Sequence, residues 1–423
     1  GSVAQIKRIV DAGADIVRLT AQGTREALNL ANIENALRED GYNVPLVADI
    51  HFNANVADVA AEIVEKVRIN PGNYVDPGRT FKKLEYTDEE YALEIEKIRQ
   101  RLIPFLNICK KHKTAVRIGV NHGSLSDRIM SRYGDTPAGM VESCMEFLRI
   151  CRDENFNDVV ISIKASNCVV MVTTMRLLVK EMEKEGMAYP LHLGVTEAGE
   201  GEDGRIKSAL GIGALLCEGI GDTIRVSLSE APEREIPVAQ KLVSFISECS
   251  QLREQCRASI ADDTVFLTLN ETETENIQLK AAMTVGALFI DGLAHKLVIK
   301  NPGFSTEFLT ELADSILQAA RIKFTRTEYI SCPGCGRTLY ALEETIAQIK
   351  AAVKEAAKTD PRFNTLKIGI MGCIVNGPGE MADADYGYVG AGPGKVSLYK
   401  NKTCLAKNIP TENAVEKLIE LIK

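Results

Sequence analysis

The chain has 423 residues, of which 50 are basic and 58 acidic, and its formal net charge of −8 at pH 7 comes without a basic block. This charge argues against nucleic acid or an anionic membrane surface as a partner. No apolar run approaches the roughly 20 residues of a membrane span, and the first residues lack a signal-peptide pattern, so we expect a soluble protein. A hydrophobic fraction of 45% in a chain of this length favours two or three domains.

The eleven cysteines are an odd number, and most of them stand singly within apolar helical patterns, as Cys144, Cys151 and Cys217 do. In such positions a cysteine packs as a small hydrophobic residue. The pattern is typical of a reducing compartment, where clustered cysteines bind metal rather than form disulfides.

After a helical start at residues 3–10, the chain alternates short β-branched runs with longer helical patterns up to residue 245. The predicted strands are residues 15–20, 45–51, 66–70, 115–121, 158–164, 190–197 and 222–227. Helices are predicted at residues 24–40, 89–113, 138–154 and 173–185. This order favours a (β/α)₈ TIM barrel whose first strand is missing from the sequence. An open doubly wound sheet is the alternative, although it usually carries a Gly-rich turn after its first strand, and none is seen here.

Two further domains are expected after this barrel domain of residues 1–245. Residues 246–326 have a polar start at 250–274 and helical patterns at 278–293 and 306–321, which indicates a small separate or inserted unit. Residues 327–423 combine clustered cysteines with a helix at 338–357, a strand at 366–371 and a Gly/Pro-rich stretch at 377–394. The last domain is therefore predicted to be α+β.

Polar side chains stand at or near the ends of the predicted barrel strands, where a barrel of this kind keeps its active site. They are Arg18, Asp49, His51, Arg68, Asn70, Arg117, Asn121, Lys164, Thr196, Glu197, Arg225 and Ser227. Four arginines and one lysine at one mouth predict an anion site, and guanidinium groups suit the oxygens of a diphosphate. Any one of these charges taken alone could simply solvate the barrel rim.

Three residues of this region could act in proton transfer. Glu197 is a carboxylate among cations and could donate or accept a proton, or it could serve only as a counter-ion. His51 and His122 are similarly placed, but a single histidine is more often a hydrogen-bonded structural residue.

The clustered cysteines predict a metal centre. Cys332 and Cys335 form a C-x-x-C on a Pro-Gly turn, Cys373 ends an apolar strand, and Glu380 follows after a Gly-Pro-Gly turn. Three thiolates with a nearby carboxylate differ from the four thiolates of an electron-transfer ferredoxin. A weaker oxygen ligand would leave one iron open to exchange, which favours catalysis over electron relay.

The cysteines and two glycine-rich segments also allow other interpretations. A structural zinc site with Cys404 as a fourth ligand is the alternative for the cysteines, whereas a thioredoxin-like pair is disfavoured because the C-x-x-C does not open a helix in a βαβ unit. Residues 390–395 resemble a phosphate-binding loop only faintly and are predicted to be a hairpin turn. Gly211 and Gly213 are expected to allow close packing at a helix start.

Seven segments together resemble the 4-hydroxy-3-methylbut-2-enyl diphosphate synthase family, and the resemblance spans nearly the whole chain. The cluster motifs are SCPGCGR at residues 331–337 and GCIVNGPGE at residues 372–380. The barrel motifs are residues 47–52, 68–72, 117–121, 196–199 and 221–227. The long stretch at residues 73–113 fits the large, three-domain type of this family, with residues 246–326 as only the latter part of its middle domain.

The resemblance implies reductive opening of 2-C-methyl-D-erythritol 2,4-cyclodiphosphate to the linear allylic diphosphate, in the methylerythritol phosphate route to isoprenoids. It implies a [4Fe-4S] cluster on Cys332, Cys335, Cys373 and Glu380, with ferredoxin or flavodoxin as electron donor. The strand-end residues would then bind the substrate, with Glu197 and Glu380 as the catalytic pair. The expected location is the bacterial cytoplasm or, in a plant, the plastid stroma.

The same resemblance leaves two assemblies open: the short form of the family closes across a homodimer, and the extra domain of the large form would allow one chain to close on itself. In either case, substrate is expected between the arginine site and the cluster. The rival class is a non-catalytic ligand-binding protein stabilised by zinc or by a cluster.

Overall fold

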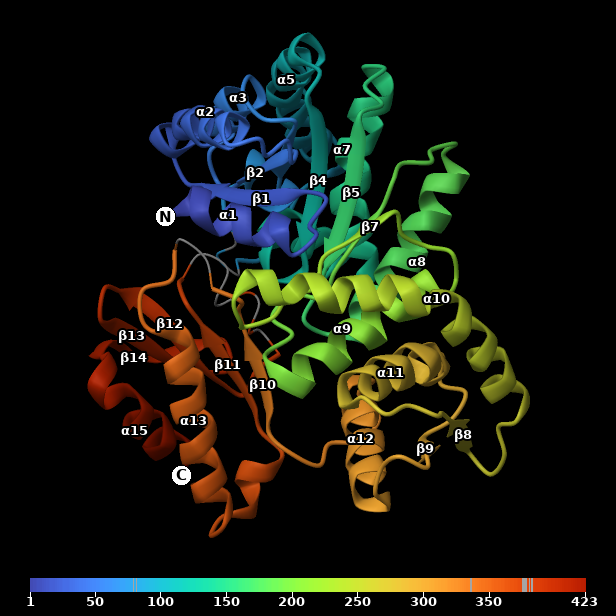
Figure 1. Ribbon diagram of the computed structural model, residues 1–423. Coiled ribbons are helices and arrows are strands. Elements are labelled where there is room, and N and C mark those ends of the chain that lie inside the picture. The colour runs from blue at the N-terminus through green and yellow to red at the C-terminus, as the bar shows by residue number, and fades with distance from the viewer. Residues whose placement is uncertain (79, 81, 335–336, 375–378, 380, 382) are drawn as a thin grey trace. The chain divides into compact units, whose positions relative to one another are not determined.

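The computed structural model describes residues 1–423 except 79, 81, 335–336, 375–378, 380 and 382 (Figure 1). The chain forms two compact units. Unit 1 comprises residues 1–164, 173–193 and 221–223, and unit 2 comprises residues 165–172, 194–220 and 224–423. The predicted barrel region therefore contributes to both units, and each unit is described separately.

A parallel sheet of five strands, in the order β1-β2-β3-β4-β5, forms the centre of unit 1. The strands are β1 (Val17–Ala21), β2 (Leu46–Ile50), β3 (Lys66–Ile69), β4 (Ala115–Asn121) and β5 (Val159–Lys164). All five residues of β2 are buried, as expected for a parallel sheet that is covered on both faces. The first five predicted strands are confirmed to within two residues at each end.

The next two predicted strands are shorter than expected. β6 (His192–Leu193) and β7 (Thr223–Ile224) form a two-stranded sheet, and Leu191, just before β6, makes a parallel bridge with Ile161 of β5. The remaining residues of both predicted strands lie outside β6 and β7, and Glu197 among them has a left-handed φ of 49°.

Helices connect these strands. They are α1 (Ser2–Asp11), α2 (Thr24–Glu39), α3 (Ala54–Ala61), α4 (Pro71–Tyr74), α5 (Asp88–His112), α6 (Asp127–Tyr133), α7 (Pro137–Asp153) and α8 (Cys168–Lys184). The start of α5 has a capping box, in which Glu90 N donates to Thr87 Oγ1 (3.2 Å) and Thr87 N donates to Glu90 Oε2 (2.8 Å). Such reciprocal bonds satisfy donors that the first turn would otherwise leave open.

Unit 2 contains four helices before its cysteine-bearing domain: α9 (Gly201–Leu216), α10 (Glu235–Ala258), α11 (Thr274–Ile290) and α12 (Thr306–Ala319). α10 runs continuously through residue 245, where the sequence predicted a domain boundary. Strands β8 (Thr264–Thr268) and β9 (Lys296–Lys300) pair in parallel and were not predicted. Their alternation of buried and exposed residues extends over only five positions each, which is too short to stand out from the flanking polar sequence.

The glycines of α9 allow close helix packing, although they lie well inside the helix and not at its start as predicted. A Cβ on Gly213 would lie 2.5 Å from Met283 Cγ of α11, and one on Gly211 would lie 2.7 Å from Val195 Cγ2. Both contacts are far shorter than van der Waals distance, so only glycine allows this approach.

The C-terminal domain of unit 2 has a five-stranded sheet in the order β10-β11-β12-β13-β14. Its elements are β10 (Glu328–Ser331), α13 (Leu342–Ala357), β11 (Lys367–Met371), β12 (Tyr386–Gly392), β13 (Lys395–Lys400), β14 (Thr403–Pro410) and α15 (Thr411–Ile422). The first three strands are parallel and the last two antiparallel. The prediction of an α+β domain is thus confirmed, as is the hairpin at residues 390–395, where Gly394 has a φ of 66°.

One face of this sheet packs against the helices. Ile368 and Ile370 of β11 and Tyr388 of β12 lie in a core shared with α13 and α15. Met371 of β11 belongs to a second, smaller core on the other side. Within the described part of the chain, no helix is both long and apolar enough to cross a membrane.

Candidate active site

The strand ends of unit 1 bring an aspartate between two arginines. Asp49 of β2 lies 3.2 Å from Arg18 Nη1 through Oδ2 and 2.8 Å from Arg68 Nη1 through Oδ1. Burial raises the pKa of the Asp49 carboxyl, but the charges of Arg18, Arg68 and His51 outweigh that effect and hold the pKa well below its usual value. Asp49 is therefore ionised and compensates part of the positive charge that the sequence suggested.

Arg68 is the most extensively bonded of the predicted residues. Besides Asp49, its Nη1 lies 2.6 Å from His51 Nε2, and its Nη2 donates to the carbonyl of Gly119 (2.7 Å) and to Asn121 Oδ1 (3.5 Å). A Cβ on Gly119 would stand 2.3 Å from Arg68 Nε, so this glycine makes room for the guanidinium against β4. No pattern in the sequence indicates this role for Gly119.

Arg117 and Lys164 are both buried, with 6% and 5% of their surfaces exposed. They lie on neighbouring strands of the same sheet, since Arg117 pairs with Arg68 in the β3–β4 register and Lys164 pairs with Asn121 in the β4–β5 register. Two further cationic side chains are thus gathered on the sheet that carries Arg68.

Asn70 and the two histidines have structural contacts. Asn70 Oδ1 accepts from Gly72 N (3.0 Å) at the start of α4, and its Nδ2 donates to Ser124 Oγ (2.8 Å). His51 Nδ1 lies 3.4 Å from Asn73 Nδ2, and His122 Nε2 lies 2.9 Å from Asp135. Unit 1 thus carries eight of the predicted residues on its five-stranded sheet or directly after a strand: Arg18, Asp49, His51, Arg68, Asn70, Arg117, Asn121 and Lys164.

The other four predicted substrate residues, Thr196, Glu197, Arg225 and Ser227, belong to unit 2. Thr196 N donates to the carbonyl of Ala165 (3.1 Å), and Glu197 follows with only 8% of its surface exposed. Arg225 lies 3.5 Å from both carboxylate oxygens of Glu235, whose Oε1 also accepts from Leu228 N (3.1 Å). The Arg225 charge is therefore partly compensated within its own unit.

A parallel bridge joins the segment after Glu197 to the strand that precedes Cys332. Ala198 pairs with Ser331, the last residue of β10. Ser229 reinforces the junction, because its N donates to the carbonyl of Gly199 (2.9 Å) and its Oγ lies 3.0 Å from both Ser331 Oγ and the carbonyl of Cys332. Ser229 was not predicted, since a serine two residues after Ser227 has no distinguishing pattern.

Two of the predicted metal ligands lie at the ends of neighbouring strands. Cys332 follows β10, Cys373 follows β11, and Cys332 Sγ accepts from the N–H of Gly372 (3.2 Å). The Tyr340 hydroxyl donates to the carbonyl of Met371 beside them (3.0 Å). Burial raises the pKa of this hydroxyl, and the nearby groups of Cys332, Tyr388 and Cys373 raise it further.

The remaining predicted ligands, Cys335 and Glu380, lie outside the described residues, and among the residues that are described no group of three metal-binding side chains occurs. Cys404, the alternative zinc ligand, lies on β14, three strands away from β11. At about 4.8 Å per strand, that separation is about 14 Å. This distance disfavours Cys404 as a partner of Cys373.

Comparison with known protein families shows which family this chain belongs to. Residues 1–240 match the GcpE TIM-barrel domain, and residues 328–423 match the GcpE protein C-terminal domain. The chain belongs to the GcpE family. The predicted barrel fold and the resemblance to the diphosphate synthase are thereby confirmed.

Members of the GcpE family from several bacteria align with the whole chain. The relative from Phocaeicola vulgatus is 52% identical over 100% of this chain and 92% of its own length, and one from Bacteroides fragilis is 51% identical over 100% and 90%. A more distant one, from Protochlamydia amoebophila, is 36% identical over 100% and 90%. Each is named 4-hydroxy-3-methylbut-2-en-1-yl diphosphate synthase (flavodoxin). The first alignment extends over 570 positions, so this relative has segments without a counterpart in the 423 residues here.

Proposed function

We propose that this chain is the oxidoreductase that opens 2-C-methyl-D-erythritol 2,4-cyclodiphosphate and yields 4-hydroxy-3-methylbut-2-enyl diphosphate, with reduced flavodoxin as electron donor. The substrate takes up two electrons, its ring opens, and one oxygen atom leaves as water. Support comes from the family membership and from the names of relatives that align with the whole chain.

The single observation in the structure that best supports this function is the convergence of Cys332 and Cys373. Their strands β10 and β11 are parallel neighbours, and the Gly372 N–H bonded to the Cys332 sulfur directly precedes Cys373. Backbone N–H bonds to sulfur are typical of iron–sulfur sites. These residues fit a [4Fe-4S] cluster with Cys335 and Glu380 as the remaining ligands, and the bound cluster would supply the electrons singly.

Substrate binding is assigned to the cations of unit 1. Arg18, Arg68, Arg117 and Lys164 come from four strands of one sheet, and Arg18 and Arg68 both pair with Asp49. Guanidinium and ammonium groups gathered in this way suit the oxygens of a diphosphate. The bonds from Arg68 to Gly119 and Asp49 fix the plane of its guanidinium, and a fixed guanidinium loses little entropy when it binds an anion.

Glu197 is assigned to proton transfer. Its backbone adopts a left-handed conformation that is rare for a residue other than glycine, and its side chain is buried. A carboxyl group held in this way can deliver a proton to the oxygen that leaves as water. The alternative, a counter-ion role, predicts that an amide at this position would be catalytically harmless.

The proposal is tested by purifying the protein without oxygen and measuring iron, acid-labile sulfide and absorbance near 400 nm. Cyclodiphosphate turnover is then assayed with reduced flavodoxin. We expect about four irons per chain, the content of one [4Fe-4S] cluster, together with formation of the linear diphosphate. Colourless protein with one zinc per chain and no turnover would support the ligand-binding alternative instead.

A further inference from the structure

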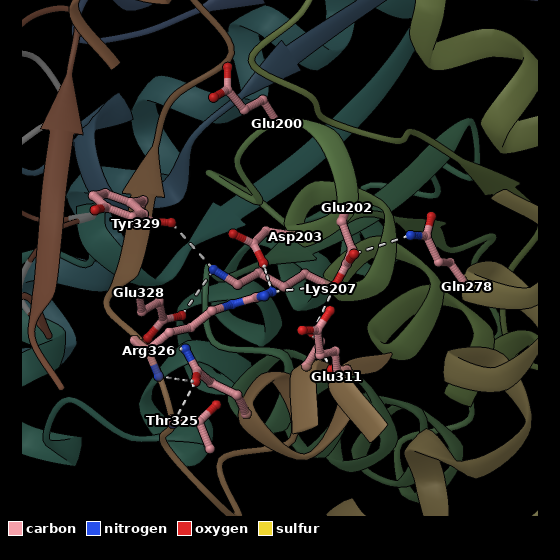
Figure 2. Close-up of polar contacts among 12 residues, drawn as sticks. Glu200, Glu202, Asp203, Lys207, Gln278, Glu311, Thr325, Arg326, Glu328 and Tyr329 are labelled. Carbon is pink, nitrogen blue, oxygen red and sulfur yellow. Dashed lines mark hydrogen bonds and ion pairs between the residues drawn. The ribbon is translucent and has the colours of Figure 1, made fainter. Parts of the chain in front are cut away.

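A buried ion pair links helix α9 to the start of β10, the strand that precedes Cys332 (Figure 2). Lys207 Nζ lies 3.0 Å from Glu328 Oε1 and donates to the carbonyl of Tyr329 (3.4 Å). Only 9% of the Lys207 side chain and 4% of the Glu328 side chain are exposed. Glu328 also pairs with Arg321 through its second oxygen.

Strand β10 is therefore attached at both of its ends to the part of the chain that follows Glu197. Ser331, its last residue, pairs with Ala198, and Glu328, its first residue, binds Lys207. At about 3.3 Å per residue the strand covers about 10 Å between these points. Two attachments this far apart hold both the position and the direction of β10.

We infer that Lys207 is a positioning residue that sets where the Cys332 end of β10 lies relative to Glu197. This inference rests on the proposed function, in which Glu197 and the cysteine ligands serve one reaction. The Lys207 side chain binds Glu328 and the Tyr329 carbonyl, so it acts through β10. Surface ion pairs rarely fix geometry, but a buried pair with a second hydrogen bond does. Breaking such a pair is costly because it leaves an unpaired charge buried away from water.

The other contacts of α9 differ from this pair. Arg326 binds Asp203 (2.6 Å) and Glu202 (3.4 Å), and Gln278 binds Glu202 (3.2 Å), as Figure 2 shows. The side chain of Arg326 is 45% exposed, and it does not bond to β10. Arg326 thus offers a matched control. Like Lys207 it forms an ion pair that involves α9, but it lacks the bond to β10 that Lys207 makes.

The test compares Lys207→Met with Arg326→Met, each made in the full chain. Turnover is measured for each variant and divided by its content of bound cluster. Lys207→Met keeps Glu328 paired with Arg321, so folding and iron content should be retained. We expect kcat to fall at least ~10-fold, because a displacement near 1 Å can cost about 100-fold in rate, while KM for the cyclodiphosphate stays within about 2-fold. Lys207→Arg, which can still reach Glu328, should restore most of the rate, and Arg326→Met should behave as wild type.

Hydrogen exchange gives a readout besides activity. In Lys207→Met, exchange should rise in peptides covering residues 194–200 and 328–332 but not in the β12–β13 hairpin, whereas general destabilisation would raise both. Unchanged kcat, or a uniform rise in exchange, would overturn the inference. If Lys207→Met failed to fold, Lys207→Gln, which keeps a donor for Tyr329 but no charge, carries the same expectations. Loss of turnover in the wild type would instead refute the proposed function itself.

Discussion

Asp49 Oδ1 and Arg68 Nη1 lie 2.8 Å apart on neighbouring parallel strands, and the same aspartate holds Arg18 through its other oxygen. An acidic protein thus builds a cationic site by aligning strand ends, and one carboxylate keeps the two arginines from repelling each other.

Replacing Arg68 by alanine should weaken binding of the cyclodiphosphate by about 10- to 100-fold, since a charge-assisted contact contributes roughly 1.5–3 kcal/mol. Iron content should stay at the wild-type level because Arg68 lies in unit 1. Binding can be followed by calorimetry on the anaerobic protein. Equal affinity in variant and wild type would remove Arg68 from the substrate site.

Glu197→Gln should bind substrate almost normally and turn over about 100- to 10,000-fold more slowly, because the amide retains the shape of the carboxyl group but cannot exchange a proton. Single-turnover measurements with pre-reduced protein separate this effect from slow electron delivery. If the variant were as fast as the wild type, Glu197 would be only a counter-ion.

Cys332→Ser and Cys373→Ser should each lose most of the iron, whereas Cys404→Ser should retain it. The reason is topological, since Cys332 and Cys373 follow adjacent strands and Cys404 lies at the opposite edge of the sheet. Iron and zinc are measured by elemental analysis after anaerobic purification. Loss of metal in Cys404→Ser would favour the zinc site over the cluster.

Glu328 should make stability depend on pH in the acid range. Burial raises the pKa of this carboxyl, but Lys207 and Arg321 lower it more, to about 2. In the unfolded chain the pKa of a glutamate is about 4.3, which is higher than the folded-state value. The ionised Glu328 therefore stabilises the fold fully above about pH 4.3, and this stabilisation is lost as the pH falls towards 2. The difference in unfolding free energy between wild type and Glu328→Gln should therefore shrink as the pH is lowered from 5 to 3, as urea titrations can measure. A constant difference would contradict the assignment.

The sequence by itself determined the barrel class, five strands of the parallel sheet, the α+β character of the last domain and the family. Those features depend on local patterns, such as β-branched runs, helical periodicity and the two cysteine motifs, which remain legible without any long-range contact. The charged strand ends could be expected to gather because the C-terminal ends of parallel strands share an edge.

Only the tertiary structure decided which charges compensate one another and which residues hold β10 in place. The Asp49 carboxylate between two arginines, the space that Gly119 leaves for Arg68, and the pairing of Lys207 with Glu328 join residues 19 to 121 positions apart. Strands β8 and β9 were missed for a related reason, since their short alternation gains meaning only when each strand finds its partner. Such contacts depend on distance in space, and no pattern along the chain records them.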